Sequence, residues 1–128
     1  MTNALTVARD ALSEALTAGG FRVVPEVPQT YSPPLCWVSP RQPYRQPGQT
    51  FSRKRVSLAV ICVAVQGTNS AALAAVDELS SDVADLIESL DGFRLDTDEI
   101  DAPVLYPSAQ GQDYLGASVN VTTEVASA

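Results

Sequence analysis

The sequence predicts an α+β domain in which a mainly antiparallel sheet of four to five strands packs against two helices. Two segments carry apolar residues at helical spacing, and several others are β-rich with alternating or continuous apolar residues. Their order along the chain is one helix, three strands, a second helix and two more strands. A length of 128 residues suits a single domain, so one core is expected for residues 1–128.

The first helix is predicted over residues 4–18. Thr2 or Asn3 can cap its N-terminus, and Gly19 with Gly20 ends it. Its apolar residues recur at the spacing that builds one stripe on a helix, at Leu5, Ala8, Leu12, Ala15 and Leu16.

A proline-rich region follows, in which seven of the nine prolines lie between Pro25 and Pro47. Residues 21–23 alternate in polarity just before Pro25 and predict a short strand at a sheet edge. Residues 35–39 predict another short strand. Residues 40–54 have no apolar periodicity, so they are expected to form an extended basic arm.

Residues 55–65 are rich in β-forming residues, and both faces of the predicted strand carry apolar side chains. This pattern predicts the central strand, covered on each side by helices or by a neighbouring subunit. Cys62 lies in this run, and Cys36 lies in an apolar run of its own. With no export signal in the sequence, we expect cytoplasmic synthesis and two buried free thiols rather than a disulfide.

The second helix is predicted over residues 70–90, with Thr68 or Asn69 as its cap and Gly92 after its end. Its apolar stripe contains Leu73, Val76, Val83, Leu86, Ile87 and Leu90. Five acidic residues form the opposite face: Asp77, Glu78, Asp82, Asp85 and Glu88.

Beyond this helix, residues 93–96 predict a strand, residues 96–103 an acidic turn, and residues 104–106 a second short strand or the resumption of the first. Residues 114–125 alternate strictly between apolar and polar or small side chains. This last strand is therefore expected to bury one face and to leave the other in water or at an interface.

The composition argues against catalysis. The chain has no histidine, which removes the commonest general base and metal ligand, and no acidic residue is set among the apolar neighbours that raise a carboxyl pKa. The acidic string from Asp96 to Asp101 fails as a calcium loop, because Asp101 stands where glycine is needed and Pro107 where a bidentate glutamate belongs. We therefore expect no enzyme activity, metal or cofactor. No apolar run is long enough to span a membrane, and no membrane partner is expected.

The charges are divided along the chain, whose net charge is −7. Between Asp77 and Asp113 there are eleven acidic residues against one basic residue, Arg94. Five of the eight basic residues lie in one short stretch, at Arg41, Arg45, Arg53, Lys54 and Arg55. Either group of charges can simply be solvated surface.

Functionally, the basic residues could contact phosphates or the acidic helix of an adjacent copy. The acidic net charge disfavours a dedicated nucleic-acid binder. A basic region that binds an acidic neighbour makes a heterologous contact, and such a contact closes into a ring when the rotation allows it.

The order of segments resembles the tail terminator, or tail-completion, proteins of long-tailed bacteriophages. The resemblance covers nearly the whole chain: an N-terminal helix with a glycine stop (ALTAGG), a proline-rich arm, a long apolar strand (RVSLAVICVAVQG), an acidic amphipathic helix (NSAALAAVDELSSDVADLIESL) and an alternating final strand (YLGASVNVTTEV).

This resemblance implies a virion subunit, assembled in the host cytoplasm, that forms a hexameric ring at the head-proximal end of the tail tube. Such a ring stops tube growth and joins the tail to head-completion (stopper) proteins, while genomic DNA passes through the lumen without sequence-specific binding. On this reading the basic cluster contacts a neighbouring subunit, the tube or DNA, and the acidic helix face contacts a partner or lines the lumen. Alternatives are another neck or minor tail assembly protein, or a small dimeric cytosolic adaptor.

Overall fold

The computed structural model describes residues 4–24, 34–48, 53–66, 69–107 and 113–126. Two helices, α1 (Ala4–Ala18) and α2 (Ser70–Glu88), accompany six strands in this part of the chain. The strands are β1 (Val23–Val24), β2 (Leu35–Pro47), β3 (Arg53–Gln66), β4 (Phe93–Ile100), β5 (Val104–Pro107) and β6 (Asp113–Ala126). The α+β class is confirmed, with one strand more than the four to five predicted.

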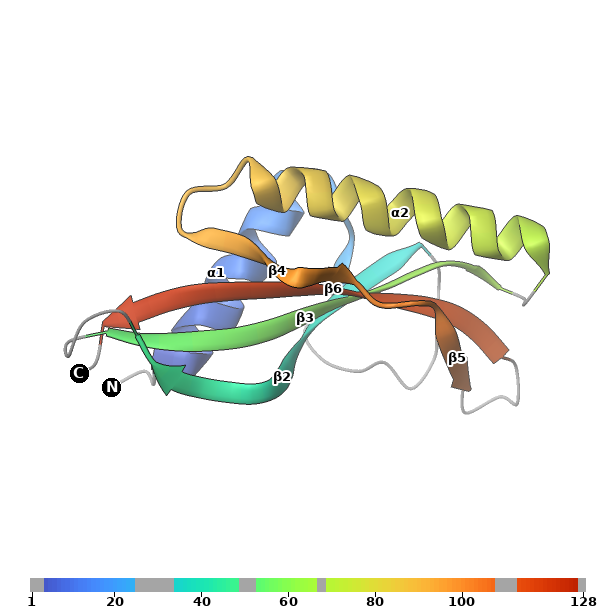
Figure 1. Cartoon of the computed structure of the whole chain (residues 1–128). Coiled ribbons are helices and arrows are strands. Elements are labelled where there is room, and N and C mark those ends of the chain that lie inside the picture. The colour runs from blue at the N-terminus through green and yellow to red at the C-terminus, as the bar shows by residue number, and fades with distance from the viewer. Residues whose placement is uncertain (1–3, 25–33, 49–52, 67–68, 108–112, 127–128) are drawn as a thin grey trace.

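The strands form one sheet in the order β1-β2-β3-β6-β4, and β5 also pairs with β6 (Figure 1). Only β1 is parallel to its neighbour, so the sheet is mixed and mainly antiparallel. The prediction that residues 55–65 form the central strand is confirmed, because β3 is paired with β2 on one side and β6 on the other.

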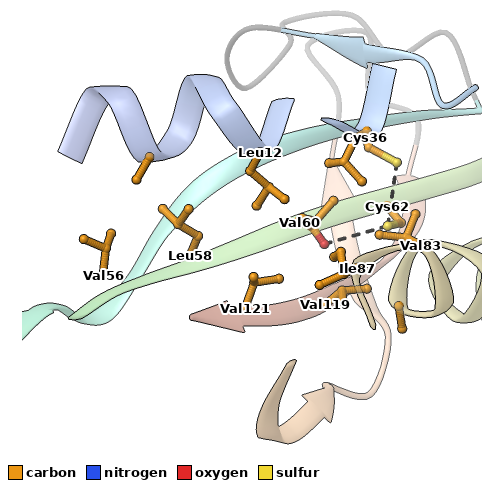
Figure 2. Close-up of a cluster of buried hydrophobic side chains, with 13 residues drawn as sticks. Leu12, Cys36, Val56, Leu58, Val60, Cys62, Val83, Ile87, Val119 and Val121 are labelled. Atoms are coloured by element: carbon orange, nitrogen blue, oxygen red, sulfur yellow. Dashed lines mark hydrogen bonds between the residues drawn. The ribbon is translucent and has the colours of Figure 1, made fainter. Parts of the chain in front are cut away.

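Both helices cover the same face of the sheet. Alternate β3 residues from Val56 to Cys62 point to this face and pack with Leu12 and Leu16 of α1 and with Val83 and Ile87 of α2 (Figure 2). Each of these side chains is buried. This cluster is the main hydrophobic core, and it uses the α1 stripe that the sequence predicts.

The two cysteines are free and buried within this core, as predicted. Cys36 and Cys62 are direct cross-strand neighbours with their sulfur atoms 3.7 Å apart (Figure 2). The hydrogen bond with Cys36 and burial raise the pKa of the Cys62 thiol. A thiol held protonated away from water is a poor nucleophile, so Cys62 serves packing.

The opposite face, which we call the second face, is divided into two ends. One end is apolar and buried within a single chain, and it contains Leu35, Trp37, Ala59, Ile61, Val63 and Tyr114. A neighbouring subunit is therefore not needed to cover the apolar half of this face. The other end is polar, and Asn120 is fully buried where the two ends meet.

The residues expected to form an extended basic arm, 40–54, are in strands throughout most of their described part. Residues Pro40–Pro47 continue β2, and Arg53 and Lys54 begin β3, so both belong to the sheet. Residues 49–52 lie outside the described part. Prolines are tolerated here because β1 pairs only as far as Trp37, after which β2 is an edge strand where a missing N–H breaks no ladder on its outer side.

The predicted acidic turn at residues 96–103 is largely wrong, because β4 extends through it to Ile100. Tertiary contacts outweigh the low strand preference of these acidic residues. The Asn120 side chain donates to the Asp98 carbonyl over 2.7 Å, and the Asp101 N–H donates to the Ser118 carbonyl over 2.9 Å. A register shift between Leu95 and Ile100 accommodates these contacts.

Helix α2 begins at the predicted cap, with the Asn69 side chain accepting from the Ala72 N–H, while Thr68, Thr2 and Asn3 lie outside the described residues. The predicted apolar stripe is wrong at Leu73, which is 42% exposed. In this first turn the buried position belongs to Ala72, one i,i+4 step before Val76. Neither described helix has the length and apolar character required to cross a membrane.

Candidate functional site

The five predicted acidic residues of α2 form one exposed surface, which we call the acidic stripe: Asp77, Glu78, Asp82, Asp85 and Glu88. At the usual helical turn of about 100° per residue they fall within an arc of about 140°. The buried residues of α2 occupy the other side of the helix. Among the described residues, no salt bridge joins the stripe to a basic side chain of the same chain.

The five predicted basic residues do not form one patch. Cross-strand partners share a face, so Lys54, which pairs with Val125, a partly buried residue packed against the main core, belongs to the helix-covered face. Arg53 and Arg55 alternate with Lys54 and belong to the second face. Arg45 is exposed on β2 beside the hairpin end, and Arg41 forms an ion pair elsewhere. The sequence cluster is thus split by strand alternation.

Arg41 of β2 reaches across the sheet to Asp96 of β4 and forms a hydrogen-bonded ion pair with it. The strands β3 and β6 lie between these two partners. The hydrogen bond from Arg41, followed by that from the Thr97 N–H, lowers the pKa of Asp96 below its usual value. Arg41 therefore ties the edges of the sheet together and has its charge compensated within the chain.

We expect the Arg41→Met variant to lose about 1 kcal/mol of unfolding free energy at pH 7, since both partners are partly exposed to water. The pKa of Asp96 is depressed in the folded state, so its contribution is complete above the ordinary value of 3.8 and is lost as the pH falls below it. The difference between the variant and the wild type should accordingly shrink at acid pH.

Urea unfolding followed by the fluorescence of Trp37, the single tryptophan, measures this difference at each pH. Arg45→Met is the matched control, because Arg45 lies on the same strand, is exposed and has no ion pair among the described residues. A constant Arg41→Met deficit from pH 7 to pH 2 would show that Asp96 ionisation is not what Arg41 stabilises.

The charged end of the second face contains a pocket of about 360 Å³. Three arginines, Arg53, Arg55 and Arg94, line it together with the carboxylates of Asp91 and Glu124. We call it the arginine pocket. Residues 90–93, which connect α2 to β4, and Thr122 and Thr123 of β6 complete the lining.

The walls of the arginine pocket are held by specific contacts. Thr123 donates its hydroxyl to the Gly92 carbonyl over 2.6 Å, which fixes the connection between α2 and β4. Gly92 has a φ of +88°, a conformation that favours glycine. Arg53 lies 3.8 Å from the Glu124 carboxylate, so these two charges partly compensate each other. Arg55 and Arg94 are exposed, and neither has an ion pair among the described residues.

Sequence reasoning identified Arg53 and Arg55 but missed Arg94, Glu124 and Asp91. Arg94 is far from the basic cluster in sequence, and it is the single basic residue of an acidic segment. It joins the pocket because β4 pairs with β6, the neighbour of β3, and this pairing places Arg94 opposite Thr122. The alternation of residues 93–96 predicts a strand, but nothing in the sequence specifies its neighbour.

The chemistry of these surfaces is electrostatic. Within the described ranges, no group of three or more Cys, Asp or Glu side chains is arranged to hold a metal ion. No protein-family model matches the chain, and no curated protein matches it significantly.

Proposed function

We propose that this chain is a structural subunit of a long-tailed bacteriophage that forms a ring at the head-proximal end of the tail tube. In this role it ends tube polymerisation and joins the tail to head-completion proteins. The observation that carries the proposal is the separation of charge: the acidic stripe lies on α2, which covers one face of the sheet, whereas Arg53, Arg55 and Arg94 of the arginine pocket lie on the second face. Among the described residues, no salt bridge joins the two within one molecule.

Two different surfaces that attract each other give a heterologous contact between copies. A heterologous contact repeated by rotation closes into a ring or continues as a filament. The α+β fold and the order of its elements support the closed form, because both are what the resemblance to tail terminators implies. The ring is proposed to be a hexamer.

The mechanism is geometric and needs no reaction. One face of the ring matches the end of the tail tube, and the other face does not match a further tube subunit, so addition stops. The net charge of −7 suits a channel through which DNA passes without being held, since like charges repel.

Loss of the protein from a phage that encodes it tests this function. We expect tail tubes of uncontrolled, excessive length that are not joined to heads, as seen by electron microscopy of the lysate. Expression of the wild-type chain in trans should restore uniform, joined tails. Normal tail length and joining without the protein would contradict the proposal.

A further inference from the structure

The lining of the arginine pocket holds three basic residues and two acidic ones, so its net charge is positive. One of the acidic residues, Glu124, lies beside Arg53, and the other, Asp91, forms no salt bridge among the described residues. Arg55 and Arg94 remain without an ion pair among the described residues. They stand on either side of β6, Arg55 opposite Glu124 and Arg94 opposite Thr122. The pocket thus presents two cations with a defined spacing.

That spacing follows from the register of the sheet. Two strand separations and an offset of two residues place the Cα atoms of Arg55 and Arg94 about 12 Å apart. On the acidic stripe, Glu78 and Asp85 are seven positions apart on the same side of α2. Their separation along the helix is about 10.5 Å. Flexible arginine side chains cover the small remaining difference.

We infer that the arginine pocket binds the acidic stripe of a neighbouring copy, with Arg55 and Arg94 contacting Glu78 and Asp85. This inference rests on the proposed ring and specifies its subunit contact. A carboxylate meets a guanidinium through paired hydrogen bonds, which gives the contact direction as well as affinity. Asp82 lies between the two contacting carboxylates in sequence and adds to the same field.

A charge-swap experiment tests the contact. The variant R55E/R94E reverses the pocket, and the variant E78K/D85K reverses the stripe. All four side chains are exposed, so circular dichroism and Trp37 fluorescence should show wild-type folds. Alone, each variant brings like charges together and should require at least about tenfold more protein for half-assembly than the wild type.

Mixing the two variants in equal amounts is expected to restore assembly. In a ring where the two variants alternate, the negative pocket of R55E/R94E meets the positive stripe of E78K/D85K. The native pocket of E78K/D85K then meets the native stripe of R55E/R94E, so every contact joins opposite charges. The control variant D10K/E14K changes the net charge by the same amount as E78K/D85K, but on the exposed face of α1, and should assemble like the wild type. Light scattering at fixed, low salt gives the mass of each sample.

The outcomes separate this contact from the proposed function. If the wild type is a ring that neither variant disturbs, or if the mixture is not restored, the contact is overturned and the ring stands. If mixing the two variants restores only a dimer, the result would support the contact and overturn the ring. A wild type that stays monomeric would overturn both as properties of the free protein. If R55E/R94E keeps its mass but loses binding to duplex DNA that the wild type shows, the pocket serves nucleic acid and the inference fails.

Discussion

Replacing Asn120 by aspartate is expected to lower the free energy of unfolding by about 3 kcal/mol at pH 7. Asn120 is completely buried. Its amide nitrogen donates to the Asp98 carbonyl over 2.7 Å, and its amide oxygen accepts from the Ser118 hydroxyl over 3.0 Å. Aspartate keeps the shape, but it places a charged acceptor against a carbonyl and loses the donor that holds β4 to β6.

The pH dependence distinguishes this cause from a simple packing defect. Burial and the facing carbonyl should raise the pKa of the introduced carboxyl, because both disfavour its charged form. A raised pKa means that the folded state binds the proton more tightly, so the variant should regain stability as the pH falls from 7 toward about 4. Urea unfolding at both pH values measures this. An equal deficit at the two pH values would contradict the assigned role of the Asn120 amide.

Replacing Gly116 by alanine is expected to cost about 2 kcal/mol, although alanine is usually preferred over glycine in a strand. A Cβ atom at this position would lie 2.6 Å from the ring of Tyr106 and 3.3 Å from a methyl group of Val63. Tyr106 has little freedom to retreat, because its ring meets Trp37 edge to face with 5.7 Å between centroids. The glycine therefore makes room for the aromatic pair over the buried end of the second face.

A double-mutant cycle with Tyr106→Ala checks this explanation. With the ring removed, the cost of Gly116→Ala should fall close to zero, which corresponds to a coupling energy of about 2 kcal/mol. Gly19→Ala is the comparison variant: the three atoms nearest to its Cβ would all belong to the flexible Leu86 side chain, which can rotate away, so the expected loss is below about 1 kcal/mol. An additive cycle would show that Tyr106 is not the obstacle.

Much of the fold follows from local patterns in the sequence. The helix over residues 4–18, the cap at Asn69 and the central β3 strand are each specified by hydrophobic spacing and by capping or stop residues. These signals are local, because the apolar stripe of a helix, or a strand that is apolar on both faces, can be recognised within one short segment of the sequence. The same patterns also indicate which residues of α1 and β3 reach the core.

The elements that the sequence mispredicted depend on contacts between distant segments. Pro40–Pro47 forms a strand by pairing with β3. Its prolines are tolerated because the short β1 leaves that part of β2 at an edge. The acidic end of β4 is extended because Asn120 and Arg41, both distant in sequence, bind it. The arginine pocket is of the same kind, since Arg94 joins Arg55 only through their shared neighbour β6. Sheet order, rather than local preference, decides all three.

The native mass of the purified wild-type chain, measured over a range of concentration and salt, tests the proposed ring most directly. The chain has a mass of 13.5 kDa, and we predict a hexamer at low salt. This hexamer should dissociate as salt is added, because salt screens the attraction between the arginine pocket and the acidic stripe. A dimer at every concentration and salt would contradict the ring and favour a small dimeric adaptor instead.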